Sequence, residues 1–312
     1  MISQRLYIGG VLLAWGMTMG WLVWSRVVPP IRHGQPPTFQ DVLPREAEVR
    51  PVEWQILLNG NAIGFATNQV IRREDGTGEL ASRVELQDLP VAKLLQQTLG
   101  WMAAALPALS GGDLDEIGEI DMSIRTEMSF SHFGELTSFT TSVGMEGFED
   151  VIKLYGAVHD DQLQVKVRSK LLADSLQEDS DGGSYRQLYE TVVQIPPGQL
   201  VADSLSPQPR LGRLKVGQSW SFQSYRPLSI TGGMDTIWAT VDEKTTIDWQ
   251  GQDRPVHVVR FRRNLQRALS AEEEPIGQLL VDEDGEVLQQ QMQVGGLQVL
   301  FVRTEDEAVL MP

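Results

Sequence analysis

The sequence contains no cysteine and only four histidines, and these two scarcities remove whole classes of functional site. Without cysteine the chain has no disulfide, no thiolate zinc site and no cysteine nucleophile. The histidines His33, His132, His159 and His257 are too far apart along the chain for a local His-x-x-x-His metal pair. We therefore expect no metal ion and no cofactor.

Catalytic motifs are missing as well. The chain has no G-x-S-x-G, no H-E-x-x-H, no Walker loop and no G-x-G-x-x-G that opens a helix after a strand. The stretch GQSWS at 217–221 comes closest to a nucleophile elbow, but it lacks the final glycine. No catalytic residue can be named, so the sequence favours a protein that is not an enzyme.

Positive charge is also scarce. The 26 lysines and arginines are outnumbered by 42 aspartates and glutamates, which gives a net charge of −16. A nucleic-acid partner would need a clustered cationic surface to meet its phosphates, so we exclude nucleic acid as a partner. The 41% of apolar residues in 312 is normal for a chain with a packed core.

The strongest positive signal is a charge-free run of 17 residues from Ile8 to Trp24. Extended to Leu6–Val28 it reaches bilayer length, with only Arg26 inside, close enough to the end to reach the interface. A cleaved signal peptide is the alternative, but SRVVPPIRHG at 25–34 offers no small-x-small cleavage site. The run predicts an uncleaved transmembrane signal anchor, with the lipid bilayer as its partner.

Gly16 and Gly20 lie four residues apart in this run, in the G-x-x-x-G spacing that lets two membrane helices approach closely. They are therefore candidates for helix packing, although glycine is also frequent in membrane helices for other reasons. Flanking charge does not decide the orientation. We expect a single-pass protein of the bacterial inner (cytoplasmic) membrane, with the bulk of the chain on the periplasmic side, because long domains translocate with little regard to flanking charge.

Four regions follow from composition. Residues 1–28 form a cytoplasmic tip and the anchor, and 29–51 form a proline-rich stalk with semi-rigid, extended backbone. We expect a β-rich lobe over 52–176 and a second one over 177–312, because the polar stretch near 177–185 is typical of a boundary between two lobes.

Alternation of apolar and polar residues predicts strands through most of the chain. In EIDMSIRTEMSF, one face collects Ile120, Met122, Ile124, Met128 and Phe130 while the other is polar. Hairpin turns are expected at Asn59-Gly60, in EDGTG at 74–78 and at Asp284-Gly285, where the backbone needs positive φ. The fold class is mainly β (α+β), with antiparallel, meander-rich curved sheets and one amphipathic helix.

That helix is expected near 90–106, with Asp88 as its N-cap and Pro90 in its first turn. Helical spacing brings its apolar side chains to one side. The helix could line an apolar ligand groove or could simply pack as an ordinary core helix. The candidates for lining a groove are Leu94, Leu95, Trp101 and Met102.

The stretch LLVDEDGEVLQQQ at 279–291 raises the question of a calcium loop. Placing Gly285 sixth puts Leu280 first and Gln291 twelfth, so the EF-hand register fails at both ends. We interpret the stretch as a tight hairpin turn. The carboxylates Asp282, Glu283 and Glu286 are then expected to be solvated residues at the rim of a sheet, where they discourage edge-to-edge pairing.

Three segments carry a resemblance to a known family: VEWQILLNGNAIGFA, LKVGQSWSFQSYRPLS and LLVDEDGEVLQQQMQVGGLQVLFVRTEDEA. They resemble the β-rich extracytoplasmic region that precedes the transglutaminase-like domain in some bacterial membrane-anchored proteins. The resemblance implies an uncharacterised envelope domain with a mainly antiparallel sheet. It implies no transglutaminase or protease activity, because the catalytic domain is not part of the match and the chain has no cysteine. A looser similarity of pattern is to the lipoprotein-carrier folds.

Three functions remain open. The preferred one is a membrane-anchored envelope protein that binds a protein partner or assembles a complex. The first alternative is a binder or carrier of a lipid or other apolar ligand in a curved-sheet groove. The second is a hydrolase that uses dispersed carboxylates.

Overall fold

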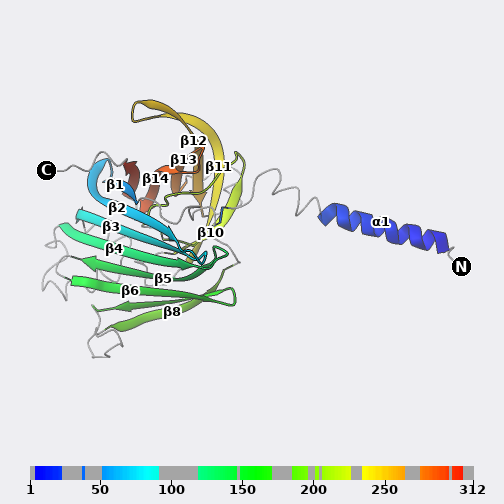
Figure 1. Ribbon diagram of the computed structural model, residues 1–312, viewed down its shortest axis with the longest axis horizontal. Helices are drawn as coiled ribbons and strands as arrows, with labels where there is room; N and C mark the ends of the chain where they lie inside the picture. The colour runs from blue at the N-terminus through cyan, green and yellow to red at the C-terminus, as the bar shows by residue number, and fades with distance from the viewer. Residues whose placement is uncertain are drawn as a thin grey trace.

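A single large β-sheet forms most of the protein (Figure 1). The computed structural model describes residues 4–22, 37–38, 51–90, 119–145, 148–170, 185–195, 201–203, 206–225, 234–263, 275–294 and 297–304. Its elements are α1 (Gln4–Leu22), β1 (Val52–Leu58), β2 (Asn61–Arg72), β3 (Gly78–Pro90), β4 (Glu119–Phe130), β5 (Leu136–Met145), β6 (Phe148–His159), β7 (Gln162–Ser169), β8 (Arg186–Gln194), β9 (Val201–Asp203), β10 (Ser219–Tyr225), β11 (Met234–Trp249), β12 (Gln252–Arg262), β13 (Gly277–Asp282), β14 (Val287–Val294) and β15 (Leu297–Thr304).

The sheet is a meander in which nearly every strand pairs with its neighbours in sequence. Its order runs β8-β7-β6-β5-β4-β3-β2-β1-β15-β14-β13-β12-β11-β10-β9. Every described pairing is antiparallel except that of β9 with β10, which is parallel. The first and last strands meet in the middle, where Glu53 pairs with Thr304 and Leu58 with Val299. The predicted antiparallel, mainly β fold is confirmed, and its strands form one sheet.

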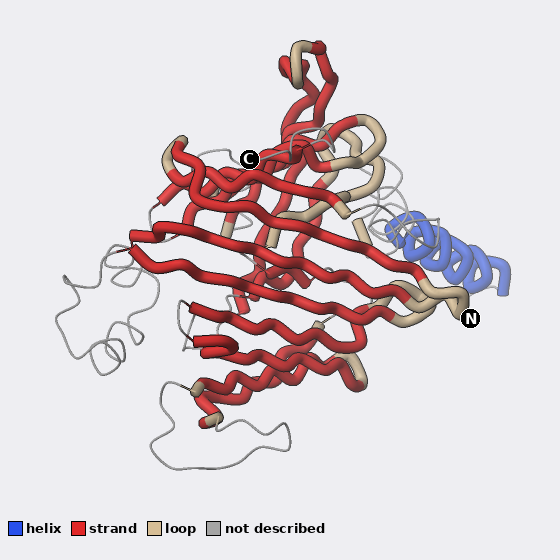
Figure 2. The backbone as a smooth tube through the Cα atoms, turned by 60° about the vertical axis from the view of Figure 1, so that its left-hand side comes forward, coloured by secondary structure: helices blue, strands red, loops and turns tan. Residues whose placement is uncertain are grey.

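The sheet curves around a large hydrophobic core. We call β1–β8 the first arm and β9–β15 the second arm (Figure 1); Figure 2 shows the curvature from another side. One cluster of buried side chains joins the two arms, since it contains Trp54 and Leu154 from the first and Val259, Leu279 and Phe301 from the second. The arms therefore share a core on one face of the sheet.

Strand β4 shows how the sequence pattern produces this arrangement. Ile124, Met128 and Phe130 are buried on the core face, whereas Arg125 and Glu127 are exposed on the other. Successive side chains of a strand point to opposite faces, so alternating hydrophobicity creates one buried and one wet surface. The strand predicted from this alternation is confirmed.

The predicted hairpin turns are confirmed by their backbone angles. Asn59 and Gly60 have φ of 49° and 87°, as a two-residue type I′ turn requires, and Gly76 and Gly285 have φ of 84° and 83°. These positions favour glycine or asparagine because other side chains rarely adopt positive φ. Turn chemistry is local, so the sequence alone was sufficient to place these hairpins.

The expected start of the amphipathic helix is wrong. Asp88 and Pro90 belong to β3, and the next pairing with β4 joins Leu89 to Ile120 after a register shift. Asp88 sits at that irregularity with φ of 51°, and its N–H donates to Asp121 Oδ1 over 3.2 Å. An aspartate before an apolar run suits an N-cap, where its carboxylate accepts from backbone N–H groups, and it also suits a strand irregularity, where it tolerates positive φ. The rest of the predicted helix lies outside the described residues.

The division of the chain into four regions stays a prediction. Strand β1 begins at Val52, where the folded region was expected to start. The expected boundary near 177 lies outside the described residues, and β8, which follows it, pairs with β7, which precedes it. The described sheet is therefore continuous across that point.

Helix α1 occupies part of the predicted anchor and lies apart from the sheet in Figure 1. Residues 23–28 of the expected span fall outside the described part of the chain. Among the residues that are described, no helix combines the length and the apolar character needed to cross a membrane.

Candidate functional site

Among the described residues, most of the large apolar side chains that are exposed lie on α1. All its large apolar side chains from residue 13 onward are exposed, with Trp15 at 62%, Met17 at 69% and Trp21 at 73%. Such a surface is unfavourable in water, since burying each of these side chains would gain about 1.5–3 kcal/mol. Because exposed apolar surfaces are typical of sites that contact a membrane or another protein, α1 is a candidate functional site.

Gly16 and Gly20, the predicted helix-packing residues, are on this helix with open space above them. A Cβ placed on either glycine would meet nothing within 4 Å. In a helix, residues four apart lie on the same face, so the two glycines form a shallow strip that a second helix can approach. Nothing described in the chain occupies this strip, and their packing role stays a prediction.

A second feature, which the sequence did not predict, is a row of polar side chains inside the core of the first arm. Asn68 pairs with Ser82, Ser82 with Thr126, and Thr126 with Thr141, so the row crosses β2 to β5 at right angles to the strands. Each of the four is at most 4% exposed. We call these four residues the buried polar row.

Two hydrogen bonds organise the buried polar row. Trp54 Nε1 on β1 donates to Asn68 Oδ1 over 2.7 Å, and the hydroxyls of Thr126 and Thr141 are 3.0 Å apart. An indole N–H can only donate, so it holds the amide with its oxygen toward Trp54. Asn68 Nδ2 is thereby directed away from β1, and neither it nor Ser82 Oγ has a hydrogen-bond partner among the described residues.

A signal for this row was present in the sequence. In β4 the inward series Ile124, Thr126, Met128 is interrupted by a threonine, and in β2 the series Ala66, Asn68, Val70 is interrupted by an asparagine. Polar residues at inward positions of neighbouring strands are informative because interiors rarely contain them without a reason. Aligning them required the strand register, which the sequence does not provide.

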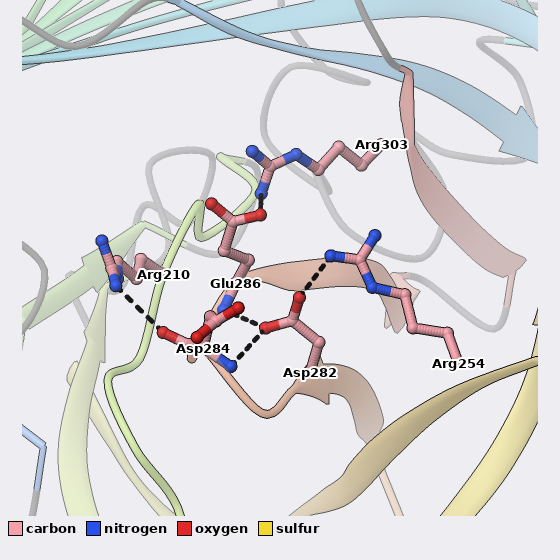
Figure 3. Close-up of polar contacts among 6 residues, drawn as sticks. All are labelled: Arg210, Arg254, Asp282, Asp284, Glu286 and Arg303. Carbon is pink, nitrogen blue, oxygen red and sulfur yellow. Dashed lines mark hydrogen bonds and ion pairs between the residues drawn. The ribbon is translucent and has the colours of Figure 1, made fainter.

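The acidic hairpin turn between β13 and β14 differs from its prediction. Asp282 is only 3% exposed, so it is not a solvated rim residue. Its Oδ1 accepts hydrogen bonds from the N–H groups of Asp284 and Glu286 over 3.0 and 2.8 Å, and its Oδ2 accepts one from Arg254 over 2.6 Å (Figure 3). The carboxylate is buried because these donors replace water around it.

Glu283 and Glu286, the other two acids predicted to be rim residues, lie nearer to solvent, in line with the prediction for Glu283. Glu283 is exposed and pairs with Lys244, which lowers its pKa. Glu286 is half-buried and contacts Arg303 over 3.4 Å (Figure 3). The three carboxylates therefore each meet a cation, and the turn is a structural feature held by charge-assisted hydrogen bonds.

Residues 209–211, which lie between β9 and β10, clamp the same turn. Arg210 donates to the carbonyl oxygen of Asp284 over 2.9 Å, Leu211 N–H donates to the carbonyl of Gly285 over 2.9 Å, and Val287 N–H donates to the carbonyl of Pro209 over 3.2 Å (Figure 3 for Arg210). These contacts satisfy backbone groups that the hairpin alone would leave unpaired. The turn is thus fixed on two sides.

His257 lies on β12 opposite Lys244, half-buried. Burial, helped by the Lys244 ammonium, lowers the pKa of the imidazole from its ordinary value, while the Glu283 carboxylate acts in the opposite direction. Its Nδ1 is buried without a hydrogen-bond partner. The surroundings therefore favour the neutral ring.

An arginine cluster follows on the same strand. Arg260 Nη1 and Arg262 Nη2 donate to Asp242 Oδ2 over 2.8 and 3.1 Å, and Arg260 Nη2 donates to Glu243 over 3.0 Å. Asp242 lies at the register shift of β11 between Val241 and Glu243, which turns both acids toward β12. Two carboxylates thus balance two guanidinium groups, and these acids are occupied by ion pairs.

The four groove candidates Leu94, Leu95, Trp101 and Met102 all lie outside the described residues. Their role stays a prediction.

Comparisons with known proteins do not assign the chain to a family. No family model matches the chain, and no curated protein matches it. One solved structure that it resembles is the beta-barrel-like protein of domain of unknown function DUF1849 from Brucella abortus, with 8% sequence identity over 82% of this chain and 95% of the other, and a TM-score of 0.45. The β-rich character expected from the resemblance to the region ahead of transglutaminase-like domains is confirmed, and the family itself stays a prediction.

Proposed function

We propose that the protein is a membrane-anchored envelope protein in which α1 inserts into the bilayer and the sheet works as a binding or assembly module. The observation that carries this proposal is the exposed apolar surface of α1, where Trp15, Met17 and Trp21 have no cover from the sheet. A bilayer supplies such a cover for side chains on all sides of a helix.

The length of the helix is compatible with this role when the adjoining sequence is included. The 19 residues of α1 would span about 28 Å at about 1.5 Å per residue, and the charge-poor sequence continues to Val28. The hydrocarbon core of a bilayer is about 30 Å thick. The proposal therefore requires α1 and residues 23–28 together.

Carbonate extraction tests the anchor. Membranes that contain the full chain are washed at high pH, which releases peripheral proteins, and the pellet and supernatant are compared. The chain should stay in the pellet, and a variant with Trp15→Glu, Met17→Glu and Trp21→Glu should move to the supernatant, because charges at the centre of a membrane helix are costly. Release of the unchanged chain by carbonate would overturn the proposal.

Assembly through α1 is supported by the open strip at Gly16 and Gly20. Replacing both glycines by isoleucine should lower the cross-linked dimer fraction of the full chain in liposomes about tenfold, since the strip is then filled. Ala14→Ile is the matched control, because Ala14 lies two positions from Gly16 on the opposite side of the helix. An unchanged dimer fraction in the glycine variant would contradict this part of the proposal.

A further inference from the structure

The buried polar row is enclosed by apolar rows on both sides along the strands. Neighbouring positions on the core face give two further aligned rows, and all their members are buried. One row is Ala66, Val84, Ile124 and Val143, and the other is Val70, Leu80, Met128 and Phe139. Across β2 to β5, a line of polar groups about 14 Å long, at about 4.8 Å per strand, therefore runs between two apolar rows on the core face.

The two polar atoms without partners make this line unusual. Asn68 Nδ2 and Ser82 Oγ are sealed from solvent, and neither has a hydrogen-bond partner in the part of the chain that the structure describes. A buried polar group left unpaired costs about 1–3 kcal/mol, and an alanine or valine at position 82 would avoid that cost. Asn68 cannot turn its amide round to find another partner, because Trp54 Nε1 needs the oxygen.

The chemistry of the row specifies what would satisfy it. Asn68 Nδ2 can only donate, and Ser82 Oγ can donate or accept, so the complementary group offers an oxygen acceptor. The row contains no charged side chain, and an ionised group would be buried there without a counter-charge. The apolar rows on both sides suit hydrocarbon.

We propose that the buried polar row binds the polar group of an uncharged amphiphile, in which an ester carbonyl or a hydroxyl is joined to hydrocarbon. The ligand oxygen accepts hydrogen bonds from Asn68 and Ser82, and its apolar part lies on the flanking rows. Since both atoms are sealed in this structure, the ligand must displace the protein atoms that now cover them. The site is independent of the membrane tether and supports the ligand-binding function that the sequence leaves open.

Photo-cross-linking tests the site. The full chain in liposomes is exposed to a monoacylglycerol that carries a diazirine next to its ester, and labelled peptides are identified by mass spectrometry. The peptides of β2, β3 and β4 should be labelled. Ser82→Val and Asn68→Leu should each lower that labelling about tenfold, as expected for the loss of one buried hydrogen bond.

Three controls separate binding from folding and from bulk lipid. Thr67→Val is the matched control, because Thr67 precedes Asn68 on β2 and points to the other face of the sheet. The Thr67→Val variant should be labelled as strongly as the unchanged chain. A fatty carboxylate with the same chain and diazirine should label these peptides less. Ser82→Ala, which is smaller than serine and should fold, repeats the test if a melting curve shows that Ser82→Val has unfolded.

Three results would overturn the proposal. One is labelling confined to α1, which would mean that the probe reaches only the bilayer. Another is labelling of β2, β3 and β4 that Ser82→Ala leaves unchanged. The third is no labelling of these strands together with a higher melting temperature for Ser82→Ala, which would mean that the core merely tolerates the unpaired groups.

Discussion

At the scale of single residues, the structure assigns different roles to acids that are indistinguishable in sequence. Asp282 and Glu283 are adjacent in DEDG, yet the first is buried against Arg254 and the second is exposed. Either acid could have been the one that points inward, because the turn motif has the same composition in both cases. Burial here depends on Arg254, which is distant in sequence and could not be predicted.

Asp282→Ala should lower the free energy of unfolding by about 2 kcal/mol, since it removes three hydrogen bonds and leaves Arg254 without its partner. Urea unfolding of the full chain, followed by circular dichroism, measures this loss. Glu283→Gln is the control and should change the stability little, because an exposed ion pair is screened by solvent. Equal effects of the two substitutions would mean that Asp282 is solvated.

His257 should make folding stability depend on pH. The unfolded imidazole titrates near its ordinary pKa of 6.5, whereas burial and Lys244 lower the pKa in the folded protein. As pH falls below 6.5, the unfolded state therefore binds the proton first, and stability present at higher pH is lost. From about pH 7.5 to about pH 5 the unchanged chain should lose more stability than His257→Gln, which cannot titrate in this range. Parallel pH profiles in urea unfolding would contradict this.

At the scale of elements, local chemistry was predictable and the fit between elements was not. The hairpins at Asn59-Gly60 and Asp284-Gly285 follow from positive φ, and β4 follows from its alternation. The clamp of residues 209–211 on the β13–β14 turn joins segments far apart in the chain, so no local pattern announces it.

Gly285→Ala should reveal that clamp. Its φ is 83°, and a Cβ there would lie 2.3 Å from the carbonyl oxygen of Gly212. Gly251, in the β11–β12 turn, has φ of 80° with nothing within 4 Å, so Gly251→Ala carries only the backbone strain of about 1 kcal/mol. Gly285→Ala should cost about 2 kcal/mol more, because backbone must shift to admit the methyl group. Equal melting temperatures for the two variants would show that the clamping segment can shift without a cost in stability.

At the scale of the whole molecule, the sequence predicted the fold class but not the sheet order. Strand β1 (Val52–Leu58) pairs with β15 (Leu297–Thr304), far away in the sequence. The core that the two strands share, which includes Trp54 and Phe301, makes this pairing specific. Such a contact can be inferred only from three-dimensional packing. The buried polar row could not be predicted from the sequence either, since its members align only once four strands are in register.

The central claim is that α1 lies in a membrane while the sheet lies outside it, and the lack of cysteine in the chain allows a clean test. Met17→Cys on α1 and Thr140→Cys on the outer face of β5 each introduce a single thiol. In intact spheroplasts, a membrane-impermeant maleimide should label Thr140→Cys at once and Met17→Cys only after detergent or denaturant is added. Labelling of Met17→Cys as fast as Thr140→Cys in intact membranes would contradict the account.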